Sequence, residues 1–208
     1  REQLLAALKH SSFSIDRCLW VGEGEGGATY EAFKAAQPAV RPTRVVAGQA
    51  MLYSSGTTGK PKGIRPPLPV EAPDNYNASK AWVVMTFGYK NGEGVHLVNG
   101  PLHHSGPSVY ATVALHYGHT GILIDKWDPE LALGLIEQHR VTNTFMVPTM
   151  FVRILKLPEE VRARYDLSSL TVMIHAAAPC PPPVKEAMIA WLGPILYESY
   201  GGTEGAGT

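Results

Sequence analysis

The chain has 208 residues, with 18 basic and 18 acidic side chains, a formal net charge of zero and an isoelectric point near 7.3. This balance excludes the strongly basic surface that nucleic acids or anionic membranes select, so we expect a small-molecule partner. A hydrophobic content of 45% is enough for a real core. No apolar run reaches the roughly 18 residues of a membrane span, and the first residues show no signal-peptide pattern.

Cysteine and histidine usage narrows the expected chemistry. Cys18 and Cys180 are too few for a disulfide framework, so we expect packed, reduced thiols and a cytoplasmic location. The chain has eight histidines, and four of them lie between positions 103 and 119. No carboxylate or cysteine completes a ligand set with them at a recognisable spacing. We therefore do not predict a histidine metal centre.

Apolar segments alternate between short runs typical of buried strands and longer stretches with helical spacing. A helix start is clearest at Asp128 and Pro129, because Asp is a favoured N-cap and Pro fits the first helical position. Leu131, Leu135 and Ile136 then fall on one predicted face. In chain order we expect a helix near residues 4–8, strands at 18–21 and 50–53, a helix at 75–86, a strand at 95–98, a helix at 108–117, a strand at 121–124, the helix from 128, strands at 144–147 and 170–174, a helix at 184–192 and a strand at 195–197.

Strands separated by helical stretches indicate an α/β fold, with layers of mostly parallel strands, right-handed crossovers and helices on both faces. In such sheets ligands bind beyond the carboxyl ends of the strands. Loops of unusual composition follow predicted strands at residues 54–63, 101–106, 176–179 and 200–204. We expect these four loops to converge on one crevice.

The loop at residues 54–63 reads Ser-Ser-Gly-Thr-Thr-Gly-Lys-Pro-Lys-Gly and is suited to a polyphosphate. Gly56, Gly59 and Gly63 allow positive φ and a close approach of the backbone to an anion, while the hydroxyls and two lysines supply donors. An ordinary surface loop rich in Ser, Thr and Gly is the structural alternative. A Walker-type loop does not fit, because only two residues separate Gly56 from Gly59 and Pro61 stands where a magnesium-binding hydroxyl belongs.

Taken together, the four loops resemble segments of the adenylate-forming enzymes, which include acyl-CoA synthetases, luciferases and the adenylation domains of peptide synthetases. Residues 54–63 resemble the phosphate loop of that family, and residues 101–106 its Pro-Leu-Phe-His segment. Residues 176–179 are similar to its Gly-Ala-Ala-Pro loop with the glycine replaced, and residues 200–204 to its Tyr-Gly-x-Thr-Glu segment. The segments occur in the family's order, and the histidine-containing one is most similar to bacterial acyl-CoA synthetases.

The resemblance implies that the chain is an incomplete fragment of the large N-terminal domain of such a ligase. Residues 1–73 would then belong to a first α/β subdomain with the phosphate loop, and residues 74–208 to a second. The small C-terminal catalytic domain would be absent, so the fragment alone would be inactive.

The implied reaction uses ATP and Mg²⁺ to activate a carboxylic acid, in fatty acid metabolism or a related process. The products are an acyl-adenylate and pyrophosphate, and the acyl group then passes to coenzyme A. Alternatives are a noncatalytic nucleotide-binding module, an adenylation domain that acylates a carrier-protein thiol, and a domain that retains only the fold.

The resemblance also implies roles for individual residues, with Lys62, His104 and Glu204 as the catalytic ones. Glu204, helped by Thr58, would bind magnesium, a metal that needs few carboxylates. Residues expected to bind the phosphates are Ser54, Ser55, Gly56, Thr57, Thr58, Gly59, Lys60 and Lys62.

Two further sets of residues are implied for the adenine side and for the acid. Tyr200 could instead be a core aromatic, and the pair of His103 and His104 could instead cap the following helix. The set for the nucleotide base is Ala177, Ala178, Pro179, Glu198, Tyr200, Gly201 and Thr203, and the set for the acid is His103, His104, Ser108, Val109, Thr112 and Gly202.

Overall fold

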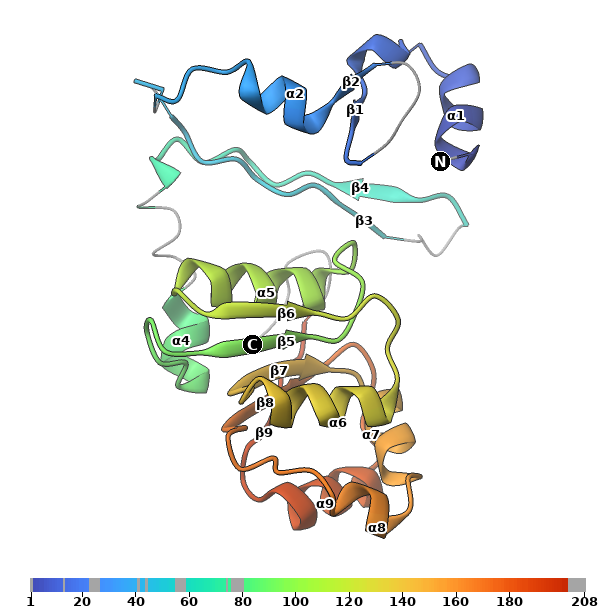
Figure 1. The fold of residues 1–208 in the computed structure, drawn as a ribbon, viewed down its shortest axis with the longest axis vertical. Helices are drawn as coiled ribbons and strands as arrows, with labels where there is room; N and C mark the ends of the chain where they lie inside the picture. Colours follow the sequence, from blue (N-terminus) through green and yellow to red (C-terminus); the bar gives the residue numbers. More distant parts are fainter. Residues whose placement is uncertain are drawn as a thin grey trace. The chain divides into compact units, whose positions relative to one another are not determined.

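The computed structural model describes residues 2–12, 14–22, 27–40, 42–43, 45–54, 59–73, 75 and 81–201. The chain divides into two compact units, residues 1–45 and residues 46–208. The first unit contains α1 (Glu2–Lys9), the 3-10 helix η1 (Ile15–Arg17), β1 (Leu19–Trp20), β2 (Ala28–Thr29) and α2 (Tyr30–Ala35) (Figure 1).

Short-range interactions organise this first unit. β1 and β2 pair in parallel, and the Thr29 hydroxyl caps α2 by accepting from the N–H of Ala32. The predicted helix near residues 4–8 and strand near 18–21 are confirmed, whereas α2 was not predicted.

The second unit begins with an antiparallel hairpin of β3 (Leu52–Ser54) and β4 (Lys62–Ile64). Ser54 and Lys62 are cross-strand partners, so the segment 55–61 connects two paired strands. The predicted strand before the phosphate-loop segment is therefore confirmed, although it pairs in this hairpin and not in the parallel sheet.

The glycines of the phosphate-loop segment differ in their backbone conformation. Gly59 has a φ of +78°, as predicted. The prediction of a positive φ at Gly63 is wrong, because Gly63 lies within β4. A Cβ at Gly63 would collide with Met51 Cε, the movable end of a flexible side chain, and would lie 3.3 Å from the ring of Tyr53. Gly56 lies outside the described residues.

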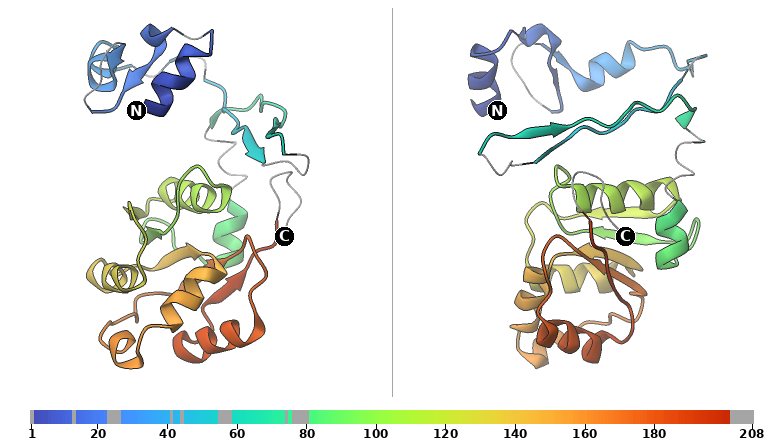
Figure 2. Two further views of the ribbon diagram at one scale, coloured as in Figure 1. Left: turned by 90° about the vertical axis from the view of Figure 1, so that its right-hand side faces the viewer. Right: turned by 180° about the vertical axis from the view of Figure 1, so that it is seen from behind.

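A five-stranded parallel sheet forms the centre of the second unit, with the strand order β6-β5-β7-β8-β9 (Figures 1 and 2). All of its neighbouring strands pair in parallel, which confirms the predicted α/β class. The strands are β5 (Val95–Val98), β6 (Thr120–Leu123), β7 (Asn143–Met146), β8 (Val172–His175) and β9 (Leu196–Glu198).

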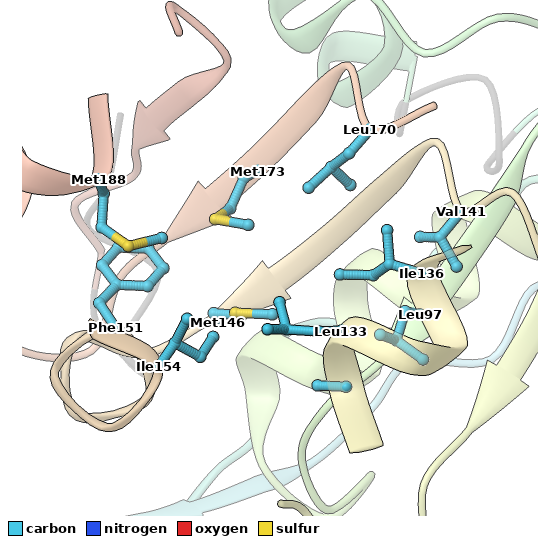
Figure 3. Close-up of a cluster of buried hydrophobic side chains, with 11 residues drawn as sticks. Leu97, Leu133, Ile136, Val141, Met146, Phe151, Ile154, Leu170, Met173 and Met188 are labelled. Atoms are coloured by element: carbon cyan, nitrogen blue, oxygen red, sulfur yellow. The ribbon is translucent and has the colours of Figure 1, made fainter. Parts of the chain in front are cut away.

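Helices pack on both faces of this sheet, as the alternating pattern predicted. One face carries α6 (Pro129–Gln138), α7 (Pro148–Leu155) and α9 (Pro182–Leu192), with the single turn α8 (Glu159–Arg162) after α7. The other face carries α4 (Ala81–Phe87) and α5 (Ser105–His116). Figure 3 shows the first of these two cores, whose buried side chains include Leu97, Leu133, Ile136, Met146, Phe151, Ile154, Met173 and Met188.

Several predicted boundaries and faces need correction. α5 begins at Ser105 and not at Ser108, and α7 and α8 were not predicted. Asp128 caps α6 as expected, accepting from the N–H groups of Glu130 and Leu131. The buried face of α6 consists of Ala132, Leu133 and Ile136, whereas the predicted Leu131 is 46% exposed. No helix among the described residues is long and apolar enough to cross a membrane.

A buried polar network lies at the amino-terminal edge of the sheet. His96 Nδ1 donates to Asn143 Oδ1 at 2.6 Å, and Asn143 Nδ2 donates to His119 Nδ1 at 3.1 Å. His119 Nε2 then donates to the carbonyl oxygen of Lys90 at 2.6 Å. Asn143 presents its amide oxygen to His96 and its amide nitrogen to His119, so His96 Nδ1 is the donor of the first bond and His119 Nδ1 the acceptor of the second. Among the described residues the buried His96 Nε2 has no hydrogen-bond partner, so a second ring proton there would find no acceptor among them.

The pKa of His96 is lowered from 6.5 to about 4, mainly by burial; the hydrogen bond to Asn143 opposes this shift and the charge of His119 adds to it. The unfolded chain takes up this proton near pH 6.5 and the folded chain only near pH 4. Stability is therefore complete above pH 6.5 and falls between these values, by up to about 3 kcal/mol at roughly 1.4 kcal/mol per pH unit.

We expect His96→Gln to flatten this acid-side loss of stability, as measured by urea unfolding at pH 7.5, 6 and 5. The variant should also be less stable at pH 7.5, since it disturbs the bond to Asn143. His116→Gln is the control, because His116 is exposed and its replacement should preserve the slope. An unchanged slope in His96→Gln would contradict the assignment.

Two residues other than glycine have φ in the left-handed region among those described, Arg140 at 51° and Ala177 at 74°. Arg140 follows the end of α6, where chains commonly adopt this conformation, and its guanidinium pairs with Asp166 at 2.7 Å. Ala177 lies in the loop after β8 and is strained by its Cβ, at roughly 1–2 kcal/mol for an L-residue.

Relief of this strain can be measured with a pair of glycine substitutions. Ala177→Gly should be neutral or stabilising by up to about 1 kcal/mol, because the strain removed exceeds or balances the added freedom of the unfolded chain. Ala178→Gly, at the adjacent exposed position with no positive φ, should lose about 0.5–1 kcal/mol. Equal losses in urea unfolding for both variants would show that Ala177 is not strained.

Candidate functional site

The carboxyl ends of the five parallel strands form one edge of the sheet. The register pairs Val98 with Leu123 and with Phe145, Met146 with His175, and His175 with Glu198, so the strands end nearly level. Three of the four loops singled out by composition leave the sheet at this edge. They follow β5, β8 and β9.

The order of strands reverses between β5 and β7. β5 leads through α5 on one face to β6, and β6 leads through α6 on the opposite face back to β7. Such a reversal leaves a crevice outside the carboxyl ends of the two strands, and open α/β sheets bind ligands there. The loop with His103 and His104 leaves β5 at this position.

The two histidines of this loop lie side by side, with ring centroids 4.4 Å apart and planes tilted by 44°. The N–H of His104 donates to the carbonyl oxygen of Pro101 at 3.0 Å, which closes a tight turn before α5. His104 occupies the N-cap position of α5, but its side chain makes no capping hydrogen bond. The alternative of a capping role for this side chain therefore finds no support. Both His103 and His104 are exposed to solvent.

The side of α5 that does not pack on the sheet carries both polar and apolar side chains. Its buried residues are Tyr110, Ala111, Val113 and Ala114, which pack on the sheet side. Val109 and Thr112 are exposed and Ser108 is half-buried. The residues predicted to contact the acid are thus available at the surface of the helix that follows the histidine loop.

The loops after β8 and β9 leave adjacent strands, because His175 and Glu198 are partners in the register. Ala177, Ala178 and Pro179 are exposed in the first of these loops. Tyr200 follows β9 and is 79% exposed, so it is not a core aromatic. The positive φ of Ala177 therefore lies within the segment predicted to receive the nucleotide base, and strained backbone of this kind clusters at ligand sites.

An ion pair fixes the carboxylate at the end of β9. Lys185 Nζ of α9 lies 2.5 Å from Glu198 Oε2, and this hydrogen bond lowers the pKa of the Glu198 carboxyl group. Sequence reasoning missed Lys185, because no local pattern links a lysine in a helix to a glutamate in the following strand. The opposite charges of the two side chains were the available signal for this ion pair, but many other lysine and glutamate pairs in the sequence have the same signal.

The remaining described residues that were predicted to bind the phosphates lie in the hairpin of β3 and β4. Ser54 is half-buried in β3, and Gly59, Lys60 and Lys62 are exposed. Seven predicted site residues lie outside the described part of the chain: Ser55, Gly56, Thr57, Thr58, Gly202, Thr203 and Glu204. Among the described residues, no group of three or more His, Cys, Asp or Glu side chains could hold a metal ion.

Known proteins match this chain closely enough to define its family. The probable CoA ligase CCL5 of Humulus lupulus is 32% identical over 159 residues, which are 76% of this chain and 28% of that protein. Amide bond synthetase McbA from Marinactinospora thermotolerans superposes with a TM-score of 0.77 and 26% identity, covering 99% of this chain and 40% of that one. ATP-bound MatB from Rhodopseudomonas palustris gives a TM-score of 0.60 and 27% identity, covering 74% of this chain and 29% of that one.

The chain therefore spans between about a quarter and two fifths of the length of these proteins. The family described as AMP-binding enzyme matches residues 11–208. This match includes all four loops and the whole parallel sheet. The chain belongs to the AMP-binding enzyme family of adenylate-forming enzymes.

Proposed function

We propose that the whole protein activates a carboxylic acid with ATP and transfers the acyl group to coenzyme A. In the first step a carboxylate oxygen attacks the α-phosphorus, the new O–P bond forms, and the bond to pyrophosphate breaks. In the second step the thiol sulfur attacks the acyl carbon and AMP leaves, while the thiol proton passes to solvent. The arrangement of three family loops at one sheet edge is the observation that carries this proposal.

The first step brings together two anions, so it requires fixed positive charge and hydrogen-bond donors. In our proposal Lys62 and the hydroxyls of the hairpin loop bind the β- and γ-phosphates of ATP. His104, beside His103 at the β5 edge, orients the acid's carboxylate. The exposed segment Ala177–Ala178–Pro179 and Tyr200 receive the adenine, and Glu198, held by Lys185, supplies a hydrogen-bond acceptor at the base.

Magnesium would be held by Glu204 with the help of Thr58. One carboxylate and one hydroxyl leave the remaining positions to phosphate oxygens and water, a donor set that suits this ion. When bound, the metal supplies charge that stabilises the leaving pyrophosphate. The division into subdomains at residues 1–73 and 74–208, and a cytoplasmic location, belong to the same proposal.

Acid-dependent exchange of pyrophosphate into ATP tests the first step in the whole protein. We choose decanoate, 4-coumarate and cholate as fatty, aromatic and sterol-derived probes. Exchange should require one of these acids. Binding of Mg-ATP with no dependence on any acid in a wider panel would favour the alternative of a noncatalytic nucleotide-binding module.

Two substitutions test the proposed phosphate and metal contacts. Lys62→Ala and Glu204→Gln should each lower the exchange rate, on the order of 10²-fold, because each removes a charge that stabilises the transition state. Lys156→Ala, at the exposed C-cap of α7, and Glu160→Gln, at an exposed position of α8, are matched controls. The unfolding midpoint should change little in all four variants. Unfolding of both site variants would reassign Lys62 and Glu204 to architecture.

A second candidate concerns the acceptor of the acyl group. The similarity to an amide bond synthetase extends over 99% of this chain, so an amine is a reasonable competitor of the thiol. Attack by an amine on the same acyl-adenylate would give an amide and AMP. With the acid that supports exchange, we expect mass spectrometry to detect a thioester when coenzyme A is supplied. An amide with added amine and no thioester with coenzyme A or a carrier-protein thiol would select the second candidate.

A further inference from the structure

Asn99 stands directly after β5, at the point where the chain leaves the sheet toward His103 and His104. Its side chain is only 3% exposed. The amide nitrogen donates to Thr144 Oγ1 at 2.5 Å, and the amide oxygen accepts from Trp127 Nε1 at 3.1 Å. A buried amide with both ends paired holds one orientation, because any rotation leaves polar groups unsatisfied.

The two partners of Asn99 connect it to separate parts of the carboxyl edge. Thr144 lies in β7 and its hydroxyl also donates to the carbonyl oxygen of Leu97 at 2.8 Å, so it links β7 to β5. Trp127 lies between β6 and α6, and the guanidinium of Arg153 in α7 sits 4.8 Å above its ring centre. Asn99 therefore joins β5, β7 and the loop after β6 on the face that carries α6 and α7.

Close packing fixes the other end of the histidine loop. A Cβ at Gly106 would collide with the ring of Phe145, so the first turn of α5 lies directly on β7. A Cβ at Gly100 would approach Pro107 Cγ to 2.8 Å, which brings the start of the loop against the start of the helix. The segment between Asn99 and Gly106 thus has both ends held, and it contains the histidine pair.

We infer that Asn99 is a positioning residue for the acid subsite: through Thr144 and Trp127 it fixes the loop that places His103 and His104 beside the acid's carboxylate. This inference rests on the proposed function. Asn99 lies on the opposite face of the sheet from α5 and touches the reaction only through the loop. Misplacement of the loop should impair use of the acid far more than use of ATP, because small displacements of orienting groups are costly.

The chain contains a matched control for Asn99. Asn143 is also a buried amide, 2% exposed, in the same sheet, and it makes its hydrogen bonds to His96 and His119 at the opposite edge. Both Asn99→Ala and Asn143→Ala should lower stability. Only Asn99→Ala should raise the KM for the acid, on the order of tenfold, with the KM for ATP changed by no more than about twofold.

The measurement is pyrophosphate exchange by the whole protein, with whichever of decanoate, 4-coumarate or cholate supports it. If Asn99→Ala does not fold, Thr144→Val and Trp127→Phe carry the test, since each removes one partner of the amide; the first keeps the side-chain shape and the second keeps an aromatic ring. They should shift the acid KM in the same direction.

Suppose that the whole protein shows acid-dependent exchange, but that Asn99→Ala, Thr144→Val and Trp127→Phe have the same KM for the acid and the same KM for ATP as Asn143→Ala. This result would overturn the inference about Asn99 and leave the proposed function standing. A protein without acid-dependent exchange would overturn the proposed function, and this inference with it.

Discussion

The second unit depends on β7, the middle strand of the sheet, whose buried polar side chains must be hydrogen-bonded within the protein. All four residues of β7 are buried, and two of them, Asn143 and Thr144, are polar. Neither side chain reaches water, so each must find its hydrogen bonds within the protein. Because successive residues of a strand face opposite sides, Asn143 points into one core and Thr144 into the other. β7 therefore ties its neighbours together on both faces.

These two residues also act at opposite edges of the sheet. Asn143 joins His96 and His119 at the amino edge, where burial lowers the pKa of His96 and favours its neutral form. Thr144 joins Leu97 and Asn99 at the carboxyl edge, where the chain turns toward the histidine pair. A single buried strand thus anchors the amino edge and the edge of the candidate site, and α/β folds commonly bind ligands at the carboxyl edge.

Much of this architecture was predictable, because strands and helices alternate and Asp128-Pro129 marks a helix start. α7 was missed because residues 144–155 form a nearly continuous apolar stretch, in which β7 passes into a helix with Pro148 at its first turn. Periodicity cannot separate strand from helix within such a run. The hydrogen bonds of Asn99 were not predicted, because its partners lie 28 and 45 residues away in the sequence. From sequence alone an Asn after a strand is typical of an exposed loop, and only the strand register shows that its amide is buried.

Two described loops of the candidate site, those after β5 and β8, are restricted by different means. Buried hydrogen bonds hold the histidine loop at Asn99, whereas the loop after β8 is restricted covalently, since Pro179 and Pro181–Pro182–Pro183 fix φ between Ala178 and the body of α9. Ala177, with its strained positive φ, lies two residues before this proline-rich stretch. In both cases conformational freedom is lost when the protein folds and not when a ligand arrives. Under the proposed function, binding free energy is then available for bringing an acid and a nucleotide together.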